Sequence, residues 1–413
     1  RCALTRPNVR QIQRRRVNAQ GRCCRWPILF ATCGFSLSWV QIGNGRLALF
    51  GTESIDTNGS SSILPESVTL YVTTPLECVE QIVRKEVQGF GIQTYEPFPY
   101  VIAIPAGGSQ LIDLVMQLNC RLSQTEKQLT KCWLALDTGD PSASQLMQAQ
   151  SLSDFIAWLD SQWLAQILND QRLETFFQPI VDIQQPEKSV GYECLLRGVA
   201  DDGSAIAPNR LFQAAKACGL LDRLDTAGRF AAIDAAAEHN LPSLIFINFN
   251  PVAIQRPACW FSETLQRAEQ QGVAVDQIVC EVVESEQAED PRILSAIMDA
   301  CREAGAKVAL DDLGAGYNSL NLLASLQPDF IKLDMQLVRS VHLDVYKGRV
   351  AAKLLELARD LDVSTVVEGV ETAEEWQWMK EHGADYAQGF LFARPARKPP
   401  ESSFFGIVGA ATA

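Results

Sequence analysis

Histidine is scarce in this sequence, and cysteine pairs with CxxC spacing are missing from it. Of 413 residues, three are histidines (His239, His342 and His382), and none adjoins the charged positions discussed below, which argues against a histidine-based zinc site. The twelve cysteines include no CxxC spacing, and most lie among apolar residues. They are typical of buried thiols in a reducing compartment, so we expect a cytoplasmic protein.

Acidic residues are absent from the first 46 positions, which makes the charge strongly uneven along the chain. Residues 1–46 carry nine Arg and no Lys, a charge of +9, so the net charge of −13 leaves −22 for the remainder (−13 − 9 = −22). An acidic body argues against broad binding of DNA or RNA, which depends on Lys and Arg facing phosphates. If this body handles a phosphate ester, we expect metal cations to offset its carboxylates.

Long apolar runs are also lacking, so we expect no membrane-spanning segment. The mostly apolar stretch Trp26–Val40 follows an Arg-rich lead, but it contains Pro27 and Gly34 and is too short to cross a bilayer comfortably. We expect residues 1–62 to be a basic segment that is disordered or lies ahead of the true start. A membrane-targeting role is the alternative. The first methionine is Met116, so the sequence does not define the amino terminus.

The pattern in residues 63–140 predicts a small α/β module. Its expected elements are a strand, a helix, a strand pair, a second helix and a last strand: Ser67–Thr73, Leu76–Val87, Ile92–Ile104, Leu111–Cys120 and Cys132–Leu136. No catalytic constellation is visible in it. A regulatory domain and a structural cap on the next domain both remain open. Residues 141–172 then form a connection, in which the apolar spacing of Ser151–Asn169 predicts an amphipathic helix.

Residues 173–400 show short apolar runs that alternate with helical stretches. The expected strands are Phe176–Ile183, Tyr192–Leu196, Leu244–Phe249, Ile278–Val283, Lys307–Leu310, Phe330–Leu333, Thr365–Val367 and Tyr386–Phe392. The expected helices are Leu211–Ala217, Thr226–Glu238, Ser262–Gln271, Ile293–Ala304, Tyr346–Leu361 and Ala373–His382. This alternation predicts an α/β fold, a modified (β/α)8 TIM-like barrel that follows the small N-terminal domain. The short link Gln184–Ser189 predicts that the first two strands form a hairpin.

Polar residues accompany nearly every one of these apolar runs, at or near its end. They are Glu193, Asn248, Glu281, Asp311, Asp312, Lys332, Glu368 and Gln388. Charged side chains inside strand-like runs are costly unless they are paired or bound to metal, and in a barrel they would converge on one mouth. Their oxygens suit hard cations such as Mg²⁺ or Mn²⁺, and two such ions can polarise a phosphodiester and deliver hydroxide. We expect desolvation to lower the pKa of Lys332, so that this lysine can help to activate water.

The motifs in this region resemble those of the EAL domain family. In order they are Gln178-Pro-Ile180, Gly191-Tyr-Glu-Cys-Leu-Leu-Arg197, Asn248-Phe-Asn-Pro251, Glu281-Val-Val-Glu284, Asp311-Asp-Leu-Gly-Ala-Gly-Tyr-Asn-Ser319, Lys332-Leu-Asp334, Glu368-Gly-Val-Glu371 and Gln388-Gly-Phe390. The resemblance covers about 220 residues. It implies a phosphodiesterase of bacterial signal transduction that hydrolyses cyclic di-GMP to linear pGpG with two Mg²⁺ or Mn²⁺ ions.

The resemblance also implies a role for each matching residue. Metal ligands would be Glu193, Asn248, Glu281 and Asp311 for one ion, and Asp312 and Glu368 for the second. Lys332 would act on the attacking water, and the catalytic group would comprise Lys332, Glu193, Asp312 and Glu368. Substrate contacts would come from Gln178, Arg197, Asp334, Glu371 and Gln388. Glu284 would tether the loop after Asp311 and Asp312. Arg197 could instead be a surface ion-pair residue, and Asp334 could instead support Lys332.

The departures from the family pattern spare every metal-binding position. Cys194 replaces Ala, Val283 replaces Thr, and Val367 stands where Ala is usual. Leu313 and Ala315 replace Phe and Thr in the loop that, by the same resemblance, couples homodimer formation through the barrel to metal binding. Three functions therefore stay open: an active phosphodiesterase, a non-catalytic cyclic di-GMP receptor with an altered loop, and a protein-interaction scaffold. The sequence does not say which signal the N-terminal module would sense.

Overall fold

The structure is a computed structural model, and it describes residues 38–42, 45–49, 64–135, 142, 147–251, 257–283, 291–314 and 319–402. Strands β1 (Ser38–Ile42) and β2 (Gly45–Leu49) pair antiparallel. They fall inside the segment 1–62 for which the sequence suggested disorder, and most of that segment lies outside the described residues. Within the described ranges, no helix is both long and apolar enough to span a membrane.

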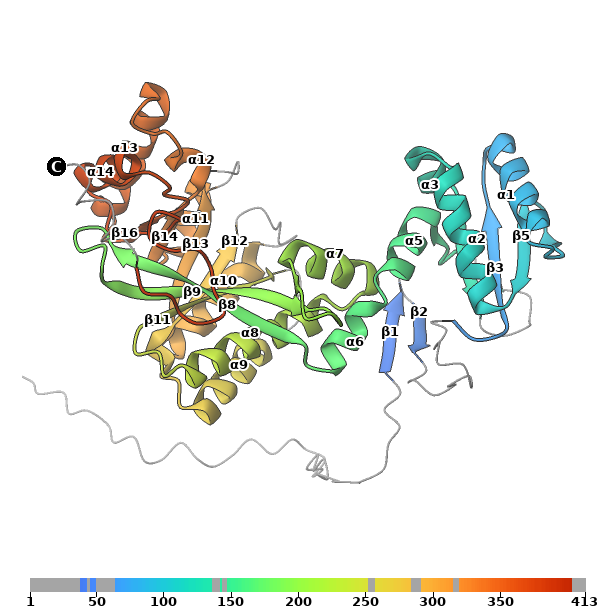
Figure 1. Ribbon diagram of the computed structural model, residues 1–413, viewed down its shortest axis with the longest axis horizontal. Coiled ribbons are helices and arrows are strands. Elements are labelled where there is room, and N and C mark those ends of the chain that lie inside the picture. Colours follow the sequence, from blue (N-terminus) through green and yellow to red (C-terminus); the bar gives the residue numbers. More distant parts are fainter. Residues whose placement is uncertain are drawn as a thin grey trace, which may run out of the picture.

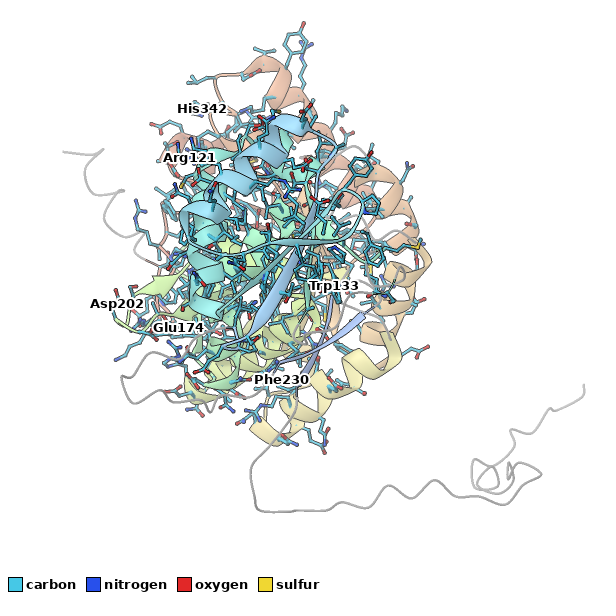
Figure 2. All side chains as sticks on the ribbon, turned by 90° about the vertical axis from the view of Figure 1, so that its right-hand side faces the viewer. Arg121, Trp133, Glu174, Asp202, Phe230 and His342 are labelled. Atoms are coloured by element: carbon cyan, nitrogen blue, oxygen red, sulfur yellow. The ribbon has the colours of Figure 1, made fainter. Side chains whose placement is uncertain are left out.

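The N-terminal module is an antiparallel sheet with helices on one face. Its strands have the order β4–β5–β3–β6–β7 and the bounds β3 Val68–Thr73, β4 Tyr95–Phe98, β5 Val101–Ala106, β6 Lys131–Ala135 and β7 Gln150–Ser151. Its helices are α1 (Glu77–Gly89), α2 (Gly108–Arg121) and α3 (Gln124–Leu129). Leu70 and Ile104 share a core with Val83 of α1, whereas Tyr71 and Ala103 cluster on the opposite face, as strand alternation requires. Figure 2 views the molecule from the side of this module.

Two helices, rather than one, connect the module to the barrel. The sequence predicted a single helix over Ser151–Asn169, but the structure has α5 (Leu152–Asp160) and α6 (Trp163–Asn169). The break comes where the backbone N–H groups of Ser161 and Gln162 bond to carbonyls three residues back, which tightens the last turn. Helix α5 contacts α2 and α3 on one side and α7 (Pro208–Cys218) of the barrel on the other, so it bridges the two parts (Figure 1).

Eight strands close the predicted barrel. They are β8 Leu173–Asp182, β9 Ser189–Val199, β11 Leu244–Phe249, β12 Ile278–Val283, β13 Lys307–Leu313, β14 Phe330–Leu333, β15 Ser364–Val367 and β16 Tyr386–Ala387. Neighbours from β9 to β16 pair in parallel, while β8 runs antiparallel to both β16 and β9 and so completes the ring. The short strand β10 (Ala205–Ile206) pairs with the outer end of β9. The α/β barrel with a hairpin at its start is therefore confirmed.

The barrel helices pack against the outside of this ring (Figure 1). Besides α7 they are α8 Leu221–Glu238, α9 Pro257–Gln271, α10 Pro291–Glu303, α11 Ser319–Leu326, α12 Met335–Val338, α13 Val345–Asp360 and α14 Ala373–Glu381, with the 3₁₀ turn η2 Val275–Gln277. The sequence had extended the last strand to Phe392, but β16 ends at Ala387. At Gly389 a Cβ would overlap the backbone of Val370, so the chain turns there over the preceding loop.

A layer of apolar side chains fills the interior of the barrel. Its buried members are Ile180, Phe246, Val279, Ala309, Phe330 and Val366. Side chains alternate between the two faces of a strand, so the residue two positions further along each parallel strand also points inward, one layer nearer the carboxyl end. In β8, which runs the other way, that layer lies two positions earlier. The predicted site residues lie in this second layer, nearer the carboxyl ends of the parallel strands.

Candidate active site

A polar layer at the barrel mouth lies one layer above the apolar layer in the barrel interior. Asn248, Glu281, Asp311, Lys332 and Glu368 each stand two residues after one of the interior apolar residues. Gln178 stands two residues before Ile180, because β8 is reversed, and Gln178 is directly opposite Glu193 in the β8–β9 pairing. The structure thus brings together side chains from separate strands, as the sequence predicted.

Lys332 lies at the centre of this layer and is fully buried. Its Nζ is 2.6 Å from Glu368 Oε1, 2.8 Å from Glu281 Oε1, 3.1 Å from Asp311 Oδ1 and 3.7 Å from Glu193 Oε1. One ammonium therefore faces four carboxylates. A buried cluster with this excess of negative charge is stable only if protons or further cations offset it.

Glu193 joins this cluster to the amide side chains of the layer. Its Oε1 accepts a hydrogen bond from Asn248 Nδ2 at 3.1 Å, and its Oε2 accepts one from Gln388 Nε2 at 2.5 Å. Gln388 Nε2 also donates to Gln178 Oε1 at 3.1 Å. These contacts connect β8, β9, β11 and the residue that follows β16, so the polar network extends around the mouth.

An irregularity in β13 turns two successive carboxylates toward the mouth. The register between β13 and β14 shifts between Leu310 and Leu313, and Asp312 adopts a left-handed backbone with a φ of 57°. Successive residues of a regular strand would point to opposite faces, whereas a bulge re-aims the side chains. Asp311 Oδ1 accepts a hydrogen bond from the Asp312 backbone N–H at 2.9 Å, which holds the turn. A left-handed non-glycine residue at such a place is a feature common at functional sites.

Burial raises the pKa of the acidic groups in the cluster. It holds the pKa of Glu281, Glu368 and Asp311 above their usual values, despite the opposing effect of Lys332, and neighbouring carboxylates add to the rise. The pKa of Asp312 is raised to about 6 by burial and by the charges of Asp311 and Asp334. When ionised, these carboxylates repel one another, so bound protons or cations stabilise the cluster.

The pKa of Lys332 moves opposite to the sequence-based expectation. Burial alone would lower it, but the carboxylates of Asp311, Glu193, Glu281 and Glu368 outweigh burial and raise the pKa well above its usual range. The expected lowering by desolvation was therefore wrong for the protein without metal, because the negative charges stand closer than the sequence could show. In this form Lys332 is an ammonium that donates hydrogen bonds.

The donor set fits hard divalent cations. Asp311, Asp312 and Glu368 each offer an oxygen, and these oxygens lie within 4.8 Å of one another. Glu281 Oε2 and the amide oxygen Oε1 of Gln388 are buried, and neither accepts a hydrogen bond from a described residue. Buried oxygens without donors are costly unless a cation or water supplies the missing partner. An all-oxygen set from Asp, Glu and Asn suits Mg²⁺ or Mn²⁺.

The remaining predicted residues stand apart from this network. Arg197 forms no ion pair with a described residue; its Cζ lies 5.3 Å from the Phe176 ring centroid, and burial lowers its pKa. Asp334 caps α12 by accepting a hydrogen bond from the Gln336 backbone N–H at 2.8 Å, and its charge acts on Asp312. Glu371 Oε1 pairs with Arg339 Nη2 at 2.6 Å.

Glu284 and residues 315–318 lie outside the described residues, and the tethering role of Glu284 stays a prediction. Leu313, which replaces the usual aromatic residue, is the last residue of β13 and is buried beside Leu333 of the next strand.

The sequence reading missed a buried ion pair beside the site. Asp225 and Arg229, one turn apart on α8, are both buried, and Arg229 Nε donates to Asp225 Oδ2 at 3.0 Å. They line a cavity of about 160 Å³ whose wall also includes Phe212, Leu196 and the metal-ligand candidate Asn248. The signal was available, since an Asp and an Arg at i and i+4 interrupt an otherwise apolar face of the helix.

Curated relatives match the barrel half of the chain. The "Probable cyclic di-GMP phosphodiesterase PdeB" of Escherichia coli is 32% identical over 226 residues, which are 54% of this chain and 42% of PdeB. The "Cyclic di-GMP phosphodiesterase PdeR" of the same organism is 29% identical over 246 residues, 58% of this chain and 36% of PdeR. The chain thus spans less than half the length of either relative.

A solved structure resembles the chain over most of its length. Klebsiella pneumoniae BlrP1, in a complex with manganese and cyclic di-GMP, is 23% identical, covers 81% of this chain with 98% of its own, and superposes with a TM-score of 0.52. At this identity the likeness shows the fold alone. The family model described as "EAL domain" matches residues 139–395, well over half of the chain. This protein belongs to the EAL domain family.

Proposed function

We propose that this chain hydrolyses cyclic di-GMP to linear pGpG with two Mg²⁺ or Mn²⁺ ions. The observation that carries the proposal is the convergence of Glu193, Glu281, Asp311 and Glu368 on Lys332, with Glu281 Oε2 left without a hydrogen-bond donor among the described residues. So dense an oxygen set is expensive to bury in a protein that binds no cation. Relatives named as cyclic di-GMP phosphodiesterases support the substrate assignment.

Divalent ions bound to these oxygens would polarise the phosphodiester and lower the pKa of a bound water. In the proposal, Glu193, Asn248, Glu281 and Asp311 hold one ion, and Asp312 and Glu368 contribute to the second. Gln388 fixes the orientation of Glu193 through its 2.5 Å hydrogen bond, and Gln178 supports Gln388 in turn. Such supporting contacts set the geometry of ligands.

Lys332 is proposed to position the attacking water. Its ammonium donates hydrogen bonds and neutralises part of the charge that develops on phosphorus oxygens. The water oxygen bonds to phosphorus, the bond from phosphorus to the ribose 3′ oxygen breaks, and the leaving oxygen takes up a proton. Cations on the surrounding carboxylates would also lower the pKa of Lys332, because they remove the negative field that raises it now.

Substrate contacts are proposed for Gln178, Arg197, Asp334, Glu371 and Gln388. Arg197 has no acidic partner among the described residues, which leaves its guanidinium able to pair with a phosphate. Asp334 and Glu371 already have partners, a helix N-terminus and Arg339, so they would contact substrate only through their remaining oxygens.

A turnover assay with purified protein tests the proposal. Cyclic di-GMP is incubated with Mg²⁺, Mn²⁺, Ca²⁺ or chelator, and the products are separated by chromatography. We expect pGpG with Mg²⁺ or Mn²⁺ and none with chelator. Glu356→Gln, a change on the exposed surface of α13, serves as a control that keeps activity. Tight binding without pGpG after long incubation would identify a receptor, and no binding with metal present would identify a scaffold.

A homodimer is proposed through the barrel. Leu343, Val345, Tyr346 and Val350 are large apolar residues that are at least half exposed, and they lie together at the start of α13. Exposed apolar clusters of this kind are typical of protein–protein contacts.

A further inference from the structure

A buried carboxylate of helix α8 is bonded to the end of strand β11. Asp225 Oδ1 accepts a hydrogen bond from the backbone N–H of Asn250 at 2.8 Å. Asn250 stands one residue beyond β11 and two residues after the metal-ligand candidate Asn248. Asp225 and Asn250 are both buried, and a hydrogen bond to a charged group is strong where water is excluded. The carboxylate therefore restrains the turn that follows Asn248.

The carboxylate of Asp225 is itself held in place by Arg229. Arg229 Nε donates to Asp225 Oδ2 at 3.0 Å, so both oxygens of the carboxylate accept a hydrogen bond. Arg229 Nη2 donates to Thr226 Oγ1 at 3.1 Å, and its Nη1 donates to Thr264 Oγ1 of α9. Arg229 and Thr264 are both buried. Asp225 is thus fixed by contacts within α8 and from α9 as well as by the turn.

Packing restrains this turn less than it would in a filled core. The cavity of about 160 Å³ is lined by Asn248, Phe249 and Asn250 at the end of β11 and by Asp225 and Arg229 of α8. Atoms that border a void lose the dispersion contacts that would otherwise help to fix their positions. The hydrogen bond from the turn to Asp225 therefore matters more here than at a well-packed site.

The position of Asn248 matters because its side chain has one atom to offer to a cation. Asn248 Nδ2 donates to Glu193 Oε1 at 3.1 Å, which leaves Oδ1 as the oxygen of this amide that can bind a metal ion. A shift of the backbone at Asn248 would move this oxygen relative to the carboxylates of the polar layer. Contacts that orient metal ligands are typically worth about 10- to 100-fold in metal affinity.

We propose that Asp225 is a positioning residue, an inference that rests on the proposed function. Through the backbone of Asn250 it sets the position of Asn248, and thereby the affinity of the site for Mn²⁺ or Mg²⁺. Arg229 contributes by fixing the carboxylate. A purely structural ion pair is the alternative, and apolar residues of similar shape could replace such a pair at little cost to the fold. Neither residue takes part in bond cleavage.

Two double variants separate the hydrogen bond from the ion pair. The first, Asp225→Leu with Arg229→Met, removes both charges together with the acceptor for the Asn250 N–H. The second, Asp225→Asn with Arg229→Met, also removes both charges but keeps a side-chain oxygen as acceptor. Calorimetric titration with Mn²⁺ alone, without substrate, should give a Kd at least about 10-fold above that of the wild type for the first variant. The Kd of the second variant should be near that of the wild type.

A control and a further variant accompany these two. Asp234→Leu with Arg267→Met is the matched control, because this pair also joins α8 to α9, with Arg267 Nε donating to Asp234 Oδ1 at 2.7 Å, but it is partly exposed. It should leave the Kd for Mn²⁺ unchanged. Asp225→Glu keeps the charge and displaces the carboxylate by one methylene. It should raise the Kd as well, which keeps the proposal testable if the first double variant does not fold.

Hydrogen exchange of the Asn250 backbone amide measures the hydrogen bond itself. It can be followed by NMR in chelator, with protein whose asparagines carry an NMR-active nitrogen isotope. The amide should be protected in the wild type and in the second double variant, and should exchange faster in the first. With cyclic di-GMP, the first variant should need more Mn²⁺ for half-maximal rate, whereas kcat at saturating Mn²⁺ should stay near that of the wild type, because Asn248 is displaced and not removed.

The outcomes distinguish this inference from the proposed function. A folded first variant that binds Mn²⁺ as tightly as the wild type refutes the positioning role and leaves the proposed function standing. Equal weakening of Mn²⁺ binding in both double variants also refutes it, because the loss would then come from the charges and not from the hydrogen bond to Asn250. A wild type that binds no Mn²⁺ overturns both proposals.

Discussion

Replacing Lys332 by methionine would remove the one cation at the centre of the acidic cluster. Met fills a similar volume, so the change acts mainly through charge. Four carboxylates within 3.7 Å of the ammonium would lose their counter-charge in a fully buried position. Removing one partner of a buried ion pair costs about 3–5 kcal/mol. For a barrel of this size that loss lowers Tm by roughly 6–20 °C.

Low pH and added Mn²⁺ should each restore stability to Lys332→Met, and together they identify the missing positive charge as the cause of the loss. The pKa of Glu281 and Glu368 is already raised in the folded protein, so protons stabilise the folded state and the benefit is lost as pH rises. The Tm deficit of Lys332→Met in chelator should therefore be smaller at pH 5 than at pH 8. Added Mn²⁺ should also restore stability, by about 2.7 kcal/mol at 100 times its Kd, because a divalent ion can replace the ammonium.

Differential scanning fluorimetry of wild type and variant, in chelator and across a Mn²⁺ titration, measures both effects. Lys353→Met, on an exposed position of α13, is the control and should leave Tm and its metal dependence unchanged. A variant as stable as the wild type in chelator at pH 8, or one that gains no more from Mn²⁺ than the wild type does, would show that Lys332 does not hold the cluster together.

Three further outcomes follow from the site. Glu281→Gln keeps the shape of the side chain but removes the charge of a fully buried residue that we propose as a metal ligand. We expect pGpG formation to fall by more than about 100-fold, which exceeds the loss typical of residues that only support metal ligands. Since the pKa of Asp312 is about 6, metal affinity measured by calorimetry should decline as pH falls below that value, and Asp312→Asn should flatten this dependence. Tyr346→Glu, on the exposed patch of α13, should shift the mass measured by light scattering from dimer to monomer.

Most of the barrel could be predicted from its sequence because the pattern of each strand is simple. The bounds of β11, β12 and β14 were predicted to the residue, since each is a short buried apolar run. Placing the carboxylates together needed one further rule, that the carboxyl ends of parallel strands share one mouth. The same rule predicted that Asn248 and Lys332 lie at this mouth.

Other features depended on contacts that no local pattern contains. The pKa of Lys332 is raised by carboxylates from three other strands and from Glu368, which follows β15. The direction of this pKa shift could therefore be predicted only once the distances to these carboxylates were known. The end of β16 depends on Val370 occupying the space beside Gly389. The break between α5 and α6 leaves the apolar spacing of Ser151–Asn169 nearly unchanged, which is why that spacing predicted one helix.

The reversed direction of β8 has a consequence for anything fused ahead of the barrel. In an all-parallel barrel the first strand starts at the face opposite the carboxyl ends of the strands, whereas here Leu173 lies on the same side of the barrel as Gln178 and the candidate active site. The outer part of the β8–β9 hairpin also reaches beyond the ring toward α6 (Figure 1). A domain that precedes the barrel is therefore attached on the side of the candidate active site, where a small movement of that domain would act most directly.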